Sequence, residues 1–192
     1  YRWYIDPIDG TTNFAHGLPL FSVSIGLATR DLEPLVGVVY HPAIGEMFSA
    51  ARGLGAWVDD QPLRVSAIDT LEMAMMSSGF PYNKATNPDN NLAQWAAMTP
   101  LIAGERRLGS AALDLAYVAA GRLDGYWEMN LNLWDVMAGI LLVREAGGRV
   151  TDYRGSARDV MGERCHVVAS NGHLHETMLH VLRESGSPLA QR

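Results

Sequence analysis

The sequence predicts one domain of layered helices and strands, an α+β or α/β sandwich over residues 1–192. Two patterns indicate this fold class. In the first part of the chain, short apolar runs are separated by brief turns, as in an antiparallel meander. In the second half, apolar runs alternate with longer amphipathic stretches, so strands alternate with helices. With 192 residues and 48% hydrophobic content, the chain can bury the core of one domain.

The first half of the chain carries most of the expected strands. Residues 3–5 form an apolar run, which predicts a buried strand that ends at Pro7, because proline has no N–H to donate to a ladder. Residues 21–27 alternate large apolar with small residues, as a strand with one buried face does. Further strands are expected at 35–40, 46–50, 56–58, 63–65 and 73–78.

The second half predicts helices between strands. Ser110 can cap one helix, which Gly121 would end, and Gly147 and Gly148 would end another. The expected helices cover residues 91–103, 110–120, 134–146 and 173–184, and the expected strands cover 124–129, 150–153 and 166–169.

Composition argues against several classes of protein. The net charge of −6 gives no basic surface of the kind that nucleic-acid binding needs. The single cysteine, Cys165, lies in an apolar run, so we expect a buried side chain rather than a nucleophile, in a reducing cytosol. No apolar run approaches the length of a membrane span, and no signal peptide is visible. We therefore expect a cytoplasmic protein that binds neither membrane nor nucleic acid.

The most informative segment is Asp6-Pro7-Ile8-Asp9-Gly10-Thr11-Thr12-Asn13-Phe14. The expected strand delivers Asp6 at its end, and Asp9 follows in a turn, so the two carboxylates can converge. If Gly10 and the threonines open a short helix, their N–H groups form an anion site. Carboxylates repel a phosphate unless divalent cations lie between them. An Asp-x-x-Asp pair alone is more typical of a solvated turn, so the whole string carries the inference.

This string resembles the first metal-binding motif of the inositol monophosphatase family, the Mg²⁺-dependent, lithium-sensitive sugar-phosphate phosphatases. Trp134-Asp135, with the glycines that follow up to Gly148, resembles the second motif. Residues 107–117 are similar to bacterial inositol-1-phosphatases in particular. The resemblance implies the sugar-phosphatase sandwich of alternating α-β-α-β-α layers. The family pattern also includes an upstream segment with two long helices, a strand and a metal-binding Glu, so the resemblance covers its later part.

The resemblance assigns roles to individual residues. Asp6 would bridge two metals, the Ile8 carbonyl would serve the first metal, and Asp9 and Asp135 would serve the second. Gly10 and Thr11 would bind phosphate through their N–H groups, and the Thr11 hydroxyl would help to orient the attacking water. The expected catalytic set is Asp6, Asp9 and Thr11, and the expected substrate-binding set is Asp9, Gly109, Ser110, Ala111 and Glu128.

Some of these residues have alternative interpretations. Asp135 stands at a helix start, where a carboxylate often serves only as a cap. Asp114 either accepts structural hydrogen bonds or faces the site. Arg106 and Arg107 either pair with acids at a dimer contact or lie on a solvated face.

The expected function is Mg²⁺-dependent hydrolysis of a phosphomonoester, foremost inositol-1-phosphate, by metal-activated water. The resemblance implies two or three Mg²⁺ ions, a small sugar or polyol phosphate as substrate, and a homodimer. Fructose-1,6-bisphosphatase and 3′-phosphoadenosine phosphatase activities are the alternatives within the enzyme class. A metal-binding interaction module that has lost catalysis is the alternative outside it.

Overall fold

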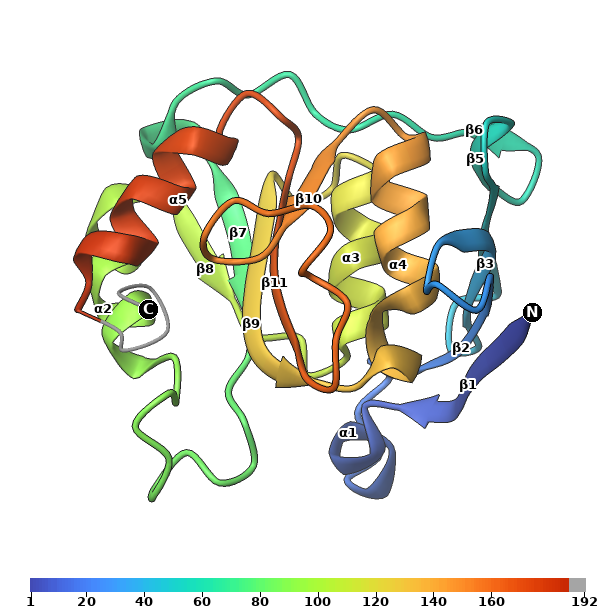
Figure 1. Cartoon of the computed structure of the whole chain (residues 1–192), viewed down its shortest axis with the longest axis horizontal. Helices are drawn as coiled ribbons and strands as arrows, with labels where there is room; N and C mark the ends of the chain where they lie inside the picture. The colour runs from blue at the N-terminus through green and yellow to red at the C-terminus, as the bar shows by residue number, and fades with distance from the viewer. Residues whose placement is uncertain (187–192) are drawn as a thin grey trace.

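Two β-sheets enclose a pair of helices in the computed structural model, which describes residues 1–186 (Figure 1). Residues 187–192 of the expected domain lie outside the described residues. The first sheet is antiparallel throughout, in the order β1-β2-β3-β4-β5-β6. Its strands are β1 (Arg2–Asp9), β2 (Ser22–Ala28), β3 (Pro34–His41), β4 (Glu46–Ala51), β5 (Gly55–Val58) and β6 (Gln61–Pro62).

The second sheet is mixed, in the order β10-β11-β9-β7-β8. The strand β7 pairs in parallel with β8 and with β9, and the pairs β9·β11 and β10·β11 are antiparallel. The strands are β7 (Met75–Ser78), β8 (Gly104–Arg106), β9 (Gly125–Leu131), β10 (Arg149–Thr151) and β11 (Cys165–Ser170).

The helices complete the layers. The helices α3 (Ala111–Ala119) and α4 (Leu133–Glu145) lie between the sheets, whereas α2 (Leu92–Met98) and α5 (His175–Glu184) cover the far face of the second sheet (Figure 1). A short helix, α1 (Thr11–Ala15), follows β1. The predicted layered α+β sandwich is confirmed, and the described residues supply four successive layers of it, β-α-β-α.

The helix α4 forms the centre of the core. Its residues 135–143 are all buried, and residues 136–143 are apolar on every side of the helix, as expected for a helix enclosed by other layers. Gly26 and Gly37 let the first sheet approach it closely, since a Cβ on Gly37 would lie 2.8 Å from the Cα of Ala138. Cys165 is fully buried on β11, as predicted, and burial raises the pKa of its thiol to about 11.

The strand β1 differs from the expectation in two ways. It continues past Pro7 to Asp9, and Pro7 instead lies where the register with β2 shifts. The expected burial of residues 3–5 is also wrong, because Trp3 and Ile5 are 62% and 54% exposed. Alternation along the strand places them on the outer face of the sheet, and Asp6 on the opposite face toward α4. An apolar run shows that a strand is present, but not which of its faces is covered.

The outer face of the first sheet is broadly apolar. The strand register places Trp3 beside Leu27 and Ile5 beside Ile25, and the same face continues across β3 and β4. None of the described helices packs on it (Figure 1). A continuous apolar sheet face of this kind is typical of a surface that another element covers. Its exposed apolar side chains are Trp3, Ile5, Val36, Tyr40 and Met47.

Smaller differences have local causes. The helix expected over 91–103 ends at Met98 and continues as a 3₁₀ turn, Thr99–Leu101, because Pro100 cannot donate a helical hydrogen bond. The strand β8 was not expected, since its three residues contain no apolar run. The hairpin arm expected at 63–65 is instead β6, which follows a tight turn at Asp59 and Asp60. The remaining expected strands and helices are confirmed to within two residues at most ends.

Among residues 1–186, no helix combines the length and the apolar character that crossing a membrane requires.

Replacing Gly37 by alanine should lower the free energy of unfolding by about 1–3 kcal/mol, because the new methyl group meets the backbone of α4. Urea unfolding measures the change. Gly162→Ala is the matched control, since the nearest atom to its Cβ would be the Arg164 carbonyl oxygen at 3.7 Å. Equal midpoints for the two variants would contradict the close packing of the sheet on α4.

Candidate metal centre and substrate cavity

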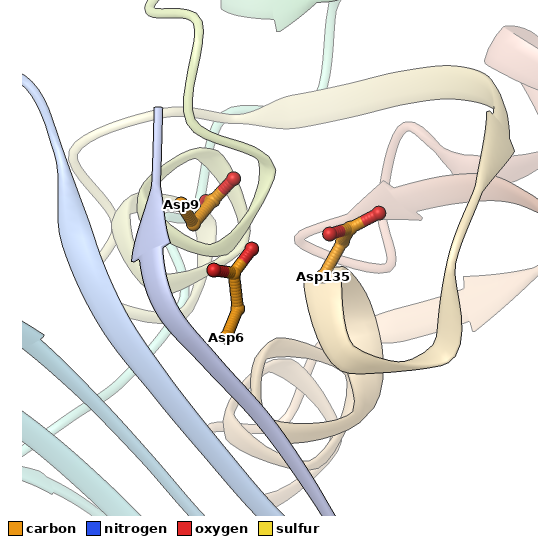
Figure 2. A group of neighbouring side chains, drawn as sticks. All are labelled: Asp6, Asp9 and Asp135. Carbon is orange, nitrogen blue, oxygen red and sulfur yellow. The ribbon is translucent and has the colours of Figure 1, made fainter. Parts of the chain in front are cut away.

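Three aspartates from distant parts of the chain meet between β1 and the first turn of α4. Asp6 and Asp9 lie on β1 and Asp135 lies on α4, and their carboxylates converge (Figure 2). One ligand oxygen from each lies within 4.8 Å of the other two. Asp9 and Asp135 are buried, and Asp6 is half-buried. The two motifs recognised in the sequence therefore build one site.

The start of α3 holds Asp9 in place. One oxygen of Asp9, Oδ2, accepts hydrogen bonds from the Ser110 hydroxyl at 2.6 Å and from the Ala112 N–H at 2.8 Å. The Ser110 hydroxyl also accepts from the N–H of Leu113, so it caps the helix. These bonds link the first motif to a segment about a hundred residues away, since the Ser110 bond spans 101 positions.

Asp135 is fixed by its own helix. It occupies the third position of α4 in a capping box with Asn132, whose backbone N–H and side-chain amide both donate to Asp135 Oδ2, at 2.7 and 3.1 Å. The capping role considered for Asp135 is thus present, and its carboxylate also lies in the aspartate cluster. Asp6 is held more simply, by the Ile8 N–H, which donates to its Oδ1 at 3.0 Å.

The carboxylates destabilise each other's charges. Burial raises the pKa of Asp9 to about 7, with Asp135 and Asp6 adding to the shift and the bonds from Ser110 and Ala112 opposing it. Burial also raises the pKa of Asp135, and neighbouring Asp6 contributes. Close carboxylates in a poorly hydrated place favour protonation unless a positive charge lies between them. The arrangement therefore suits a cation.

The donor set fits a hard divalent cation. The hydrogen bonds that Asp6, Asp9 and Asp135 accept go to one oxygen of each carboxylate, Oδ1, Oδ2 and Oδ2 respectively. Among the described residues, no hydrogen bond uses the second oxygen of any of the three carboxylates, so these oxygens are available to bind a cation. All the ligand atoms are oxygens, which Mg²⁺ and Ca²⁺ prefer, and there is no histidine or cysteine in the cluster.

The cluster opens into a cavity of about 350 Å³. Most of the residues predicted for the site line it: Asp6, Asp9, Gly10, Thr11, Gly109, Ala111, Glu128 and Asp135. Two predicted residues do not line it. Ile8 presents its carbonyl to the Thr11 hydroxyl at 3.3 Å, and Ser110 is buried behind Asp9.

Gly10 permits the sharp turn between β1 and α1. Its φ of 88° is left-handed, and a Cβ would lie 2.9 Å from the Leu20 carbonyl oxygen. The turn is anchored by Asn13, whose side-chain amide donates to the carbonyls of Leu20 and Leu108, both at 2.7 Å. Thr11 then opens α1, so the short helix considered in the sequence is present and its first residue borders the cavity.

Glu128 lies across the cavity, on β9. Burial raises its pKa to about 7, while the hydrogen bond from the Tyr126 hydroxyl, at 2.6 Å, and the charge of Arg107 oppose the shift. Gly79 packs directly against this carboxylate, since a Cβ there would overlap it. The Asn91 amide in turn donates to the Gly79 carbonyl at 2.7 Å. The Tyr126 hydroxyl and the close packing of Gly79 therefore fix the position of the Glu128 carboxylate.

Sequence reasoning missed part of the cavity wall. Asn132 could have been found from its capping-box spacing to Asp135. Arg107 was considered only for a dimer contact or a solvated face, and Asp114 is buried in α3 outside the lining. The lining residues that were not predicted are Phe80, Tyr82, Arg107, Leu131, Asn132 and Trp134.

Curated relatives are similar along nearly the whole chain. The inositol-1-monophosphatase of Synechocystis is 48% identical over 182 residues, which are 95% of this chain and 62% of the relative. The Nus factor SuhB of Pseudomonas aeruginosa is 45% identical over all of this chain and 70% of its own length. The chain thus spans about two thirds of these relatives.

Solved structures agree with the fold. The inositol monophosphatase of Anabaena (Nostoc) is 44% identical, with a TM-score of 0.91 over 98% of this chain and 76% of that one. The inositol monophosphate-bound SaIMPase-II is 28% identical, with a TM-score of 0.84 over 98% and 72%. The family model described as the inositol monophosphatase family matches residues 1–187. With its two carboxylate motifs joined in one cavity, the chain belongs to the inositol monophosphatase family.

Proposed function

We propose that this chain is part of a Mg²⁺-dependent phosphatase that hydrolyses a phosphomonoester, foremost inositol-1-phosphate. One observation carries the proposal: the three carboxylates that can hold cations line the same cavity as Gly10, Thr11 and Glu128. Membership of the family, whose relatives include enzymes named inositol-1-monophosphatase, supports the reaction class.

Bound divalent cations in such a site lower the pKa of a water and neutralise charge on the phosphate and the leaving oxygen. In our proposal Asp6 would contribute to holding both Mg²⁺ ions, the Ile8 carbonyl would help to hold the first, and Asp9 and Asp135 would help to hold the second. A third ion would complete the set that the family resemblance allows. The ligand oxygens within 4.8 Å of one another support this arrangement.

Other residues would bind the substrate. The N–H groups of Gly10 and Thr11 would bind phosphate oxygens, and the Thr11 hydroxyl would orient the water that attacks phosphorus as the ester P–O bond breaks. Glu128 would accept hydrogen bonds from polyol hydroxyls, and Asp9 would also border the substrate. The segment Gly109-Ser110-Ala111 would flank the polyol, with the Ser110 hydroxyl serving mainly to position Asp9.

Three rival functions make different predictions. Phosphate release from inositol-1-phosphate, fructose-1,6-bisphosphate and 3′-phosphoadenosine 5′-phosphate, with and without Mg²⁺, separates the two enzyme alternatives from the proposal. We expect fastest release from inositol-1-phosphate, and only with Mg²⁺. Mg²⁺ binding without release from any substrate would instead favour the interaction module.

Finer features belong to the same proposal. The all-oxygen donor set and the family resemblance support inhibition by Li⁺, which would replace the second Mg²⁺. The resemblance also supports a homodimer, and the single buried Cys165 is in keeping with a cytoplasmic protein.

Asp6→Asn should lower kcat on the order of a thousandfold and leave the fold intact, because it removes a charge that would help to hold both cations. Initial rates and circular dichroism measure the two outcomes. Asp60→Asn, in the exposed turn after β5, is the control for loss of one surface carboxylate and should be fully active. A folded Asp6→Asn enzyme with a tenth of the activity would remove Asp6 from the metal site.

Mg²⁺ affinity should fall as the pH falls below 7. Asp9 has its pKa raised to about 7, so below this pH the cation must displace a proton, and affinity should drop about tenfold per pH unit. Titration calorimetry at about pH 6 and about pH 8 tests this effect. Glu128→Gln should keep the same pH dependence, since Glu128 is outside the cluster although its pKa is also raised to about 7. A pH-independent affinity would contradict the role of Asp9.

Glu128→Gln should lower kcat/KM for inositol-1-phosphate by about tenfold or more, and change that for an aryl phosphate much less. Gly79→Ala should show the same selective loss, because its methyl group would displace the Glu128 carboxylate. Kinetics of both variants on both substrates test this. Equal losses on the two substrates would place Glu128 in the metal site or the scaffold instead.

A further inference from the structure

A loop over residues 80–90 forms part of the cavity wall. It leaves the second sheet at the end of β7 and returns at the start of α2, and two of its residues, Phe80 and Tyr82, line the cavity. The residues on either side of the loop, Gly79 and Asn91, are joined by a hydrogen bond, because the Asn91 side-chain amide donates to the Gly79 carbonyl at 2.7 Å. One side chain therefore closes the base of the loop.

The Asn91 side chain uses both of its amide hydrogens and its oxygen. The amide nitrogen also donates to the Ser78 hydroxyl at 2.7 Å, and the oxygen accepts from the Tyr153 hydroxyl at 3.2 Å. The Ser78 hydroxyl in turn donates at 2.6 Å to the carbonyl of Trp127, which precedes Glu128 on β9. Asn91 is 1% exposed, so the loss of any of these bonds would leave a buried polar group without a partner.

The backbone of Asn91 adopts an uncommon conformation. Its φ of 67° is left-handed, a region that asparagine tolerates better than most other residues with a side chain. Asn91 stands just before α2, where its carbonyl accepts a hydrogen bond from the Trp95 N–H at 3.0 Å. The Trp95 ring lies 5.3 Å from the ring of Phe80, so the same helix also contacts the first residue of the loop. A buried polar residue held in this way at a cavity wall points to a positioning role.

Gly79 is the point at which Asn91 acts on the substrate cavity. A Cβ on Gly79 would overlap the Glu128 carboxylate, so the backbone of Gly79 packs directly against it. The Tyr126 hydroxyl binds Oε2 of the same carboxylate at 2.6 Å. If Gly79 moved away, the carboxylate could turn about that single hydrogen bond. The place of Gly79, and therefore the bond from Asn91, determines the direction in which Glu128 points.

We propose that Asn91 is a positioning residue for substrate recognition: by closing the base of the 80–90 loop it holds Gly79 against Glu128 and so directs this carboxylate to the polyol hydroxyls. The inference rests on the proposed function, because it takes Glu128 as the acceptor for those hydroxyls. Asn91 does not line the cavity and is not part of the aspartate cluster. It should therefore affect the choice of substrate much more than the chemistry at phosphorus.

Asn91→Gly removes the side chain without straining the backbone, since glycine adopts a positive φ readily. We expect kcat/KM for inositol-1-phosphate to fall by about tenfold, through KM more than kcat, and kcat/KM for an aryl phosphate to change by about twofold or less. Asp59→Gly is the matched control. Asp59 has a φ of 49° and its side chain accepts a hydrogen bond from the Met47 N–H, but it lies in the turn between β5 and β6. The control should keep the wild-type ratio of the two kcat/KM values.

Two further variants test the route of the effect. Tyr153→Phe removes the donor to the Asn91 oxygen and leaves Asn91 in place, so the ratio should move in the same direction by about threefold. Glu128→Ala leaves no carboxylate to position, so adding Asn91→Gly to it should change the ratio by about twofold or less. Circular dichroism and thermal unfolding establish which variants are folded.

The outcomes separate this inference from the proposed function. An unchanged ratio in folded Asn91→Gly, or in Tyr153→Phe if Asn91→Gly does not fold, would overturn the positioning role and leave the phosphatase standing. Equal losses on the two substrates would show a scaffold role, and losses that add to those of Glu128→Ala would show another route, so either would also overturn it. Absence of Mg²⁺-dependent hydrolysis of both substrates by the wild-type protein would overturn the proposed function and this inference with it.

Discussion

The mutual repulsion of three carboxylates is the constraint on which the rest of the site depends. Asp6, Asp9 and Asp135 are held within 4.8 Å of one another in a place where burial already disfavours their charges. Buried carboxylates this close together stay ionised only if each accepts hydrogen bonds and a cation binds the oxygens that accept none. The turn at Gly10 and the Glu128 side chain both border the cavity into which this cluster opens.

The scaffold meets the demand by placing two helix starts against one strand. The N-terminal ends of α3 and α4 bring partial positive charge to Asp9 and Asp135, through the Ala112 N–H and the capping box of Asn132. The close approach of β2 and β3 to α4, at Gly26 and Gly37, sets how near β1 can come to that helix. Packing between the first sheet and α4 therefore also sets the distances between the aspartates of the site.

The sequence predicted the layered fold and the residues whose chemistry is carried by a local string. Asp6 and Asp9 could be named because they lie in one short string that resembles a family motif, and Asp135 because its segment resembles the second motif. Phe80 and Arg107 could not, since each reaches the cavity only through tertiary packing. The buried strand expected at Trp3 was wrong for a related reason: periodicity shows alternation, but only the neighbouring layers decide which face is covered.

The position of β1 at the edge of its sheet has a consequence for dynamics. Among residues 1–186 this strand pairs only with β2, and it carries two of the three carboxylates. A single local opening of this edge would therefore separate both Asp6 and Asp9 from Asp135. Edge segments open more readily than the centre of a core. A cation that binds only the closed form would oppose that opening by mass action. Protection of the β1 amides from hydrogen exchange should thus rise with Mg²⁺ concentration, and cation occupancy would act as a latch on the first strand of the fold.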